Sequence, residues 1–315
     1  MLPSRKTSQV LALAASLASG TAFAAEPESC QSVTFSDVGW TDITATTATA
    51  SVVLEGLGYE PETQVLSVPV TYASLKNNDV DVFLGNWMPT MEADIAPYRE
   101  DGTVETVVTN LEGAKYTLAV PQYTYDAGLK SFADIAKFAD ELDGKIYGIE
   151  PGNDGNRLIL DMIENDTFGL KDFEVVESSE AGMLSQVRRA VGSKEHVVFL
   201  GWEPHPMNAN IEMAYLEGGD DVFGPNYGGA TVHTNTRAGL SEECPNLGKL
   251  LKNMVFSLQM ENEIMGKILD DGAEPQKAAE EWLKANPDAL GPWLEGVTTF
   301  EGEPGLDAVK AHLGM

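Results

Sequence analysis

Three tryptophans follow short β-rich runs of the sequence and stand close to glycine: Trp40, Trp87 and Trp202. Because ligands of open α/β sheets bind beyond the carboxyl ends of the strands, these positions predict side chains that line a cleft rather than fill a core. Several aromatic faces suit a trimethylammonium group, which has no N–H donor but is attracted to the negative faces of indole and phenol rings. Each desolvated contact of this kind contributes on the order of 2 kcal/mol. The three tryptophans therefore predict a cage for a quaternary ammonium compound.

A tryptophan taken singly is more often a half-buried packing residue. We apply that interpretation to Trp282 and Trp293, because both fall in a helical section near the C-terminus. Two polar residues, by contrast, share the strand-end position of the cage candidates: Asp42 and Asn153. Asp42 could accept a hydrogen bond from a ligand. Alternatively, its carboxylate could stabilise the first turn of a helix by interacting with the helix dipole. Asn153 could cap a helix, and the glycine-rich turn around it could hold an anion on its backbone N–H groups.

Strands and helices alternate along the first two thirds of the chain, which predicts βαβ units and an α/β fold with mainly parallel sheets. The later third keeps a period of about 3.6 residues in its apolar positions, which predicts helices. Strands are expected at 33–37, 64–68, 80–84, 145–149, 174–177 and 196–200, and helices at 41–56, 73–77, 157–164, 182–191, 247–269 and 275–285.

The chain has no long linker and no low-complexity tract, but its length suits two lobes of ordinary size. We expect a discontinuous lobe A of residues 25–111 plus 209–315, with lobe B, residues 112–208, inserted into it. A short internal repeat supports this division. Phe-Leu-Gly-Asn-Trp-Met-Pro at 83–89 resembles Phe-Leu-Gly-Trp-Glu-Pro at 199–204, and the two copies fall in different lobes. A ligand held by rings of both lobes would stabilise the closed form of the protein.

The N-terminus has the features of a secretory signal peptide. Two basic residues precede an apolar run that ends at Ala18, and an Ala-Phe-Ala site predicts cleavage after Ala24, which removes residues 1–24. The apolar run is shorter than the roughly 20 residues that a membrane-spanning helix needs. Cys30 lacks the sequence context of a lipoprotein anchor. The mature protein is therefore expected in a periplasm.

Acidic residues outnumber basic residues by 49 to 20, for a formal net charge of −29 at pH 7. This balance argues against nucleic acid and anionic membrane surfaces as partners, because both need basic patches. It fits a solvated acidic surface and slightly favours a cationic ligand. The two cysteines, Cys30 and Cys244, are expected to form a disulfide in an oxidising compartment, with two unpaired buried thiols as the alternative.

Four stretches of the sequence resemble the choline-binding proteins of bacterial ABC importers, which belong with the wider glycine betaine/choline type II solute-binding family. They are Asp-Val-Gly-Trp-Thr-Asp at 37–42, Phe-Leu-Gly-Asn-Trp-Met-Pro at 83–89, Gly-Ile-Glu-Pro-Gly-Asn at 148–153 and Phe-Leu-Gly-Trp-Glu-Pro-His-Pro at 199–206. The resemblance extends over nearly the whole mature chain and implies a two-lobed periplasmic-binding-protein fold of type II. It also implies an aromatic box of Trp40, Trp87, Tyr116 and Trp202, and Tyr116 enters only through this resemblance.

The same resemblance implies that Asp42 and Asn153 contact the hydroxyl end of choline. A carboxylate at Asp42 would accept a hydrogen bond from an alcohol, attract the cation and repel the carboxylate of glycine betaine. Choline is therefore the expected ligand, with acetylcholine and betaines as further candidates. A protein that binds glycine betaine or proline betaine for osmoprotectant uptake is the alternative. The expected partners are the permease and ATPase of the importer, and the protein itself is expected to be a monomer.

An enzyme is the main alternative to a binding protein, and the sequence offers little support for it. No G-x-S-x-G elbow, P-loop or G-x-G-x-x-G fingerprint is present, and the four histidines show no metal-ligand spacing. His205 lies close to Trp202 and Glu203, so a hydrolase of choline esters can be imagined, but no nucleophile can be identified. We therefore expect a binding protein with no cofactor and no metal, which serves an importer or, on the same fold, a sensor.

Overall fold

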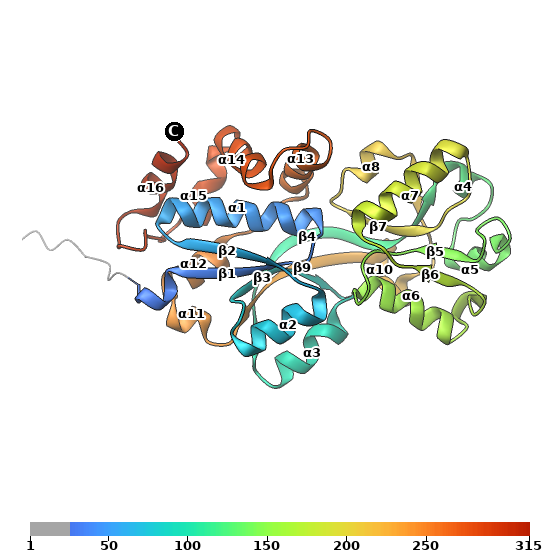
Figure 1. Cartoon of the computed structure of the whole chain (residues 1–315), viewed down its shortest axis with the longest axis horizontal. Coiled ribbons are helices and arrows are strands. Elements are labelled where there is room, and N and C mark those ends of the chain that lie inside the picture. The colour runs from blue at the N-terminus through green and yellow to red at the C-terminus, as the bar shows by residue number, and fades with distance from the viewer. Residues whose placement is uncertain (1–25) are drawn as a thin grey trace, which may run out of the picture.

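The computed structural model describes residues 26–315; the predicted signal peptide and its cleavage site lie outside the described residues. Within this part of the chain, nine strands form one mixed sheet with helices on both faces. Figure 1 shows two lobes side by side, joined by two long strands that run from one lobe to the other. The predicted α/β arrangement of two lobes is confirmed.

The first lobe holds the N-terminal strands and the C-terminal helices. Its strands are β1 (Ser32–Asp37), β2 (Glu60–Val65) and β3 (Val82–Met88), and β1 pairs in parallel with both of the others. Its helices are α1 (Thr41–Leu57), α2 (Val68–Asn77), α3 (Glu92–Glu100), α11 (Leu240–Glu243), α12 (Pro245–Asn253), α13 (Leu258–Leu269), α14 (Pro275–Ala285), α15 (Leu290–Trp293) and α16 (Gly305–His312). In Figure 1, α1 lies with α13, α14 and α16 along one face of the sheet, and α2 and α3 cover the other face.

The second lobe is smaller and is built from the middle of the chain. Its strands are β5 (Lys145–Tyr147), β6 (Glu174–Val176), β7 (Phe199–Glu203) and β8 (Met213–Tyr215), and β5 pairs in parallel with β6 and β7. Its helices are α4 (Gln122–Asp126), α5 (Phe132–Ile135), α6 (Asp154–Glu164), α7 (Glu180–Ser193), α8 (Met207–Asn210), α9 (Asp220–Phe223) and α10 (Pro225–Gly228). As Figure 1 shows, α6 and α7 lie on opposite faces of this part of the sheet.

Two long strands, β4 (Val104–Pro121) and β9 (Gly229–Arg237), join the lobes. They pair with each other in antiparallel fashion, β9 continues onto β3, and β4 continues onto β7 and β8. Parallel pairing thus holds in the outer strands of each lobe, as expected from the βαβ pattern. The joining strands pair antiparallel because the chain crosses between the lobes in opposite directions.

The residue boundaries of the lobes stay a prediction. β4 passes without a break through the first expected crossing, near residue 111. Beyond the second expected crossing, near residue 208, β8 still pairs with the second-lobe end of β4, at Ala119–Pro121. We therefore propose that the chain returns to the first lobe along β9, from Gly229, rather than at residue 209.

Several predicted elements shift at their ends. The strand expected at 64–68 is β2, which ends at Val65, and Val68 begins α2 with a proline in the first turn. The single helical stretch expected at 247–269 is two helices, α12 and α13, because the chain between them turns to hydrogen bond with β4. The backbone N–H of Phe256 donates to the carbonyl of Asn110 there, at 2.7 Å. The helix expected at 275–285 is confirmed as α14.

Helix α1 is almost fully buried although it is rich in threonine. The hydroxyls of Thr46, Thr49 and Ser51 each donate to a backbone carbonyl one turn earlier, so these polar atoms are buried with a hydrogen-bond partner. Gly58 ends the helix in the left-handed conformation, with φ of 88°. The helix therefore packs inside the first lobe with its N-terminus at the junction between the lobes.

A disulfide joins Cys30 and Cys244, whose Cα atoms lie 5.7 Å apart, as the sequence predicts. Cys30 precedes β1, and Cys244 directly precedes α12. Both elements belong to the first lobe, so the disulfide constrains that lobe.

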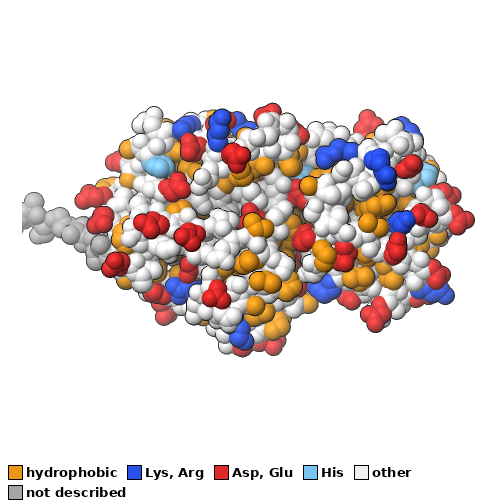
Figure 2. Space-filling view, viewed as in Figure 1, with side chains coloured by type: hydrophobic (Ala, Val, Ile, Leu, Met, Phe, Trp, Pro, Cys, Tyr) orange, Lys and Arg blue, Asp and Glu red, His pale blue; other side chains and the backbone are white. Residues whose placement is uncertain are grey.

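The surface carries the acidic excess of the sequence. Figure 2 shows Asp and Glu side chains spread over both lobes on the viewed face rather than gathered in one patch. This distribution fits the interpretation of a solvated acidic surface. Among the helices of residues 26–315, none combines the length and the apolar character that crossing a membrane requires.

Candidate functional site

The N-terminus of α1 brings two predicted residues to the junction between the lobes. Trp40 is the residue before the helix and Asp42 lies in its first turn; their exposed fractions are 5% and 1%. The Trp40 indole Nε1 donates to the Oε1 of Glu150 at 2.8 Å. Glu150 follows β5 in the second lobe, so this hydrogen bond holds the indole across the junction.

Trp87 lies near the end of β3, where it stands opposite Val232 of β9. Its indole Nε1 donates to the Oδ2 of Asp42 at 3.1 Å, which orients both side chains. Gly85, two residues earlier, lets β3 lie close to α1, because a Cβ there would come within 2.8 Å of the Ile43 side chain. The first lobe thus contributes two indoles and one carboxylate from adjacent elements.

The second-lobe side of the sheet contributes Tyr116 and Trp202 as a cross-strand pair. Tyr116 of β4 stands directly opposite Trp202 of β7 in the antiparallel register, which puts both side chains on the same face. The first turn of α6 leaves room for the phenol ring because residue 155 is glycine. A Cβ on Gly155 would lie 2.0 Å from the Tyr116 hydroxyl oxygen.

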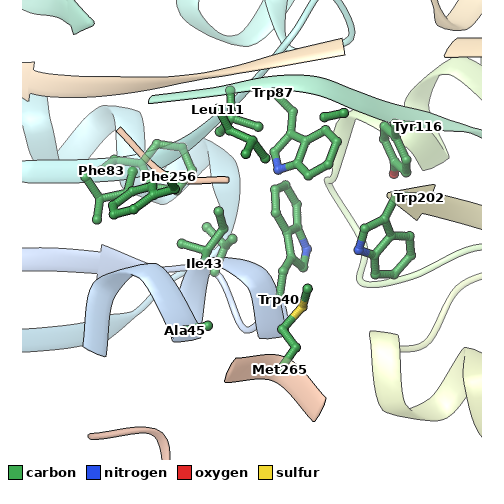
Figure 3. Packing of buried hydrophobic residues seen from close by; sticks show 14 of the residues in the cluster. Trp40, Ile43, Ala45, Phe83, Trp87, Leu111, Tyr116, Trp202, Phe256 and Met265 are labelled. Carbon is green, nitrogen blue, oxygen red and sulfur yellow. The ribbon is translucent and has the colours of Figure 1, made fainter. Parts of the chain in front are cut away.

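The four rings face one another around a small space, as Figure 3 shows. The centroids of Trp87 and Tyr116 are 6.0 Å apart, and those of Tyr116 and Trp202 are 6.2 Å apart with planes at 82°. The space comprises about 260 Å³ outside protein atoms and is lined by Trp40, Asp42, Trp87, Tyr116, Ile149 and Trp202. Part of that volume is open to solvent, so the space between the rings is smaller still and suits a compact compound.

Asn153 lies beside this space but does not line it. It is the N-cap of α6, and its side-chain oxygen accepts a hydrogen bond from the backbone N–H of Asn156 at 2.7 Å. The capping role considered from the sequence is therefore present. Its Nδ2 is buried without a hydrogen-bond partner among the described residues, so a donor remains available for a ligand that extends in this direction.

A second layer of polar side chains supports the cage. Glu180, the first residue of α7, accepts hydrogen bonds from the backbone N–H of Thr41 at 2.9 Å and from the Thr41 hydroxyl. His205 Nε2 lies 3.2 Å from the same carboxylate, and its Nδ1 accepts from the backbone N–H of Met207 at 2.9 Å. His205 therefore donates to Glu180 through Nε2. Its ring packs edge-on against Trp202, with centroids 5.0 Å apart.

Several buried carboxyl groups surround the cage, and their pKa values are raised. Burial, together with the nearby Glu180, raises the pKa of Asp42 from 3.8 to about 8. Burial also raises the pKa of Glu150, against the hydrogen bond from Trp40 that lowers it. Glu261 of α13 is fully buried, and burial together with Asp42 raises its pKa well above the ordinary value. A cation inside the cage would relieve this concentration of acidic groups.

The structure thus brings five of the six predicted residues around one space and places Asn153 next to it. The prediction that Trp87 and Trp202 follow their strands is wrong, because β3 and β7 continue through them while pairing with β9 and β4. Trp282 and Trp293 are buried in the helical section, as expected for packing residues.

Three residues of the site went unnoticed in the sequence: Ile149, Glu150 and Glu180. Ile149 is the last residue of the strand predicted at 145–149 and Glu150 directly follows it, so the strand-end rule could have found both. Nothing near Glu180 marks it in the sequence, because its partner Thr41 lies 139 residues away.

Two lobes that share a continuous sheet and enclose a small aromatic space at their junction are the arrangement of a solute-binding protein. Comparisons with known proteins identify the family. The chain belongs to the family described as the substrate-binding domain of ABC-type glycine betaine transport systems, whose model matches residues 31–285. Its fold is the type II periplasmic-binding-protein fold expected from the sequence.

Two solved structures and a curated protein that are similar to this chain are of this class. An ABC-transporter choline-binding protein in complex with choline is 72% identical, with a TM-score of 0.91 over 92% of this chain and 100% of that chain. The same kind of protein in an unliganded semi-closed conformation is also 72% identical, with a TM-score of 0.85 over 91% of this chain and 100% of that chain. The glycine betaine/carnitine transport binding protein GbuC of Listeria monocytogenes is 28% identical over 164 residues, which are 52% of this chain and 53% of that protein.

Proposed function

We propose that this protein captures choline by cation–π contacts in the box of Trp40, Trp87, Tyr116 and Trp202. The observation that carries the proposal is the set of four ring faces around one enclosed space. Such a wall stabilises a methylated cation without hydrogen bonds, and the buried position keeps water from competing. The complex of a 72% identical protein with choline supports the same ligand.

In this proposal, Asp42 distinguishes choline from zwitterionic betaines. Its Oδ1 is buried and has no hydrogen-bond partner among the described residues, so it is free to accept from a ligand hydroxyl. The Nδ2 of Asn153 is the second candidate for contact with the hydroxyl end. A betaine carboxylate would instead lie close to a carboxylate that is already costly to ionise.

A betaine-binding protein for osmoprotectant uptake is the second candidate function. Glycine betaine is named in the description of the family and in the name of GbuC, and the name of GbuC also includes carnitine. A trimethylammonium group would fill the same rings in either case. The N-terminus of α6, with its backbone N–H groups beside Asn153, offers one position for a betaine carboxylate.

The protein would deliver its ligand to the permease and ATPase of an ABC importer, as its family does. We infer that it works as a monomer in the periplasm after cleavage behind Ala24, because the first residues read as a signal peptide. Fractionation of cells that express the full chain, with mass determination of the mature protein, tests the cleavage site.

Calorimetric titration of the mature protein with choline, acetylcholine, glycine betaine and proline betaine tests the ligand. We expect choline to bind most tightly of the four, and at least about tenfold more tightly than glycine betaine, which corresponds to about 1.4 kcal/mol. Tighter binding of glycine betaine would contradict the role given to Asp42 and favour the second function. Release of acetate from acetylcholine would contradict the class of binding protein.

A further inference from the structure

Two helix N-termini meet beside the cage, and one carboxylate lies between them. α1 begins at Thr41 in the first lobe, and α7 begins at Glu180 in the second. The unpaired N–H groups at each N-terminus and the helix dipole favour negative charge there. The Glu180 side chain is 4% exposed and receives both the backbone N–H and the hydroxyl of Thr41.

The contact between Thr41 and Glu180 matters for the cage because of the position of Thr41 in the sequence. It separates Trp40 from Asp42, two residues that line the cage. On the other side, Glu180 accepts from His205, which packs against Trp202. One carboxylate of the second lobe therefore holds the start of α1 and supports a ring of the opposite wall, without lining the ligand space itself.

We propose that Glu180 is a positioning and specificity-determining residue, whose built-in carboxylate takes the anion position at the start of α1 and so excludes ligands that carry a carboxylate. This inference rests on the proposed function and adds a residue that selects the charge of the ligand. The α1 N-terminus is otherwise a ready position for an anion beside the cage. With Glu180 in place, a betaine carboxylate would meet an occupied N-terminus and a second carboxyl group at Asp42.

The same carboxylate acts across the junction of the lobes. It joins α7 to α1, as the Glu150 carboxylate joins the second lobe to the Trp40 indole. Both hydrogen bonds join a carboxylate of the second lobe to a donor of the first lobe, so they form only when the lobes are close. Glu180 therefore stabilises the closed form in which the rings face one another.

Calorimetric titration of wild type, Glu180→Gln and Glu195→Gln with choline and glycine betaine, at one pH and one ionic strength, tests the inference. Glutamine keeps the size of the side chain and removes its charge, and Glu195 is an exposed acidic residue just after α7 that serves as the matched control. We expect Glu180→Gln to bind choline more weakly and glycine betaine no more weakly, so that the ratio of the two Kd values shifts by about tenfold towards betaine. Glu195→Gln should keep the wild-type ratio.

An unchanged ratio in a folded Glu180→Gln protein overturns the inference, while choline binding by wild type keeps the proposed function intact. Wild type that fails to bind choline overturns the proposed function and this inference with it. Glu180→Asp provides an independent test, because it keeps the charge but withdraws the carboxylate from Thr41. We expect it to weaken choline binding, and wild-type affinity for choline in this variant would overturn the positioning role.

Discussion

The two copies of the Phe-Leu-Gly motif place one tryptophan in each lobe in the same way but surround it differently. Trp87 and Trp202 each lie one residue before the end of a strand, and each strand pairs antiparallel with one of the two long joining strands. The Trp87 indole donates to Asp42 within the first lobe. Trp202 instead packs against His205, which donates to Glu180. The ring walls are thus repeated, and their polar partners are not.

The rings and their polar partners therefore have different roles in the site. The repeated rings enclose methyl groups and spread the attraction to a cation over several faces. The polar partners determine which other groups a ligand can carry, because Asp42 and the Glu180 network place negative charge at defined sides of the cage. Variants of the rings should therefore change affinity for all quaternary ammonium ligands alike, and variants of the polar partners should change selectivity.

Removal of a ring gives the largest expected effect. Trp202→Ala opens the second-lobe wall to water and should weaken choline binding by about 100-fold or more, as truncation of a buried aromatic anchor does. Calorimetry measures the loss, and Trp282→Ala, which truncates a buried tryptophan of α14, is the control that should lower stability and leave the Kd unchanged. Near-normal binding by Trp202→Ala would break the model of a four-ring box.

Neutralising the first-lobe carboxylate has the next largest effect. Asp42→Asn keeps an acceptor for Trp87 but removes the charge, so we expect choline to bind about tenfold more weakly at pH 8.5 while glycine betaine is affected much less. Titration of both ligands measures this selectivity. Asp161→Asn, an exposed change on α6, is the control. Equal losses for both ligands would show that Asp42 acts only through packing.

Affinity should also depend on pH through Asp42. Its pKa in the ligand-free protein is about 8, and a cation in the cage lowers the pKa because it favours the charged form. Choline binding therefore releases a proton below pH 8, and the Kd should fall as pH rises from 6 to 8, by at most tenfold per pH unit. Measurements between pH 6 and 9 test this trend.

The stability of the ligand-free protein has the opposite pH dependence. The pKa of Asp42 is raised on folding, so its contribution to the free energy of unfolding is lost as pH rises through about 8. The increase in Tm on adding choline should consequently be larger at pH 8.5 than at pH 6. Asp154 also titrates in this range, because burial raises its pKa to about 7, and Glu180 and Glu261 face Asp42 as well. Asp42→Asn isolates the effect, and an unchanged pH profile in that variant would assign it to the other groups.

The smallest expected effect concerns the hydroxyl of Tyr116. This oxygen is buried and has no hydrogen-bond partner among the described residues. Tyr116→Phe keeps the ring and should change the Kd for choline by less than about threefold. A much larger loss by calorimetry would mean that the hydroxyl contacts the ligand, and the second-lobe wall would then share in selectivity.

Much of the cage could be predicted from local sequence, since aromatic residues near strand ends follow from the alternation of strands and helices. Trp40, Trp87 and Trp202 were found in this way, while Tyr116 depended on the family resemblance because it lies inside a long strand. The strand ends themselves were misplaced at β3 and β7, where pairing with the joining strands extends them. Such pairing depends on residues far away in the sequence, which no local pattern reveals.

By itself, the sequence determined the chemistry of the cage, because Trp side chains and their spacing after apolar runs are local properties. It also predicted the disulfide between Cys30 and Cys244, which is present in the structure. Only the tertiary structure decided which carboxylates surround the rings, since Glu150 and Glu180 come from the second lobe and act on residues of the first. Long-range packing of two helix N-termini and two long antiparallel strands brings them together, and this packing selects the charge of the ligand.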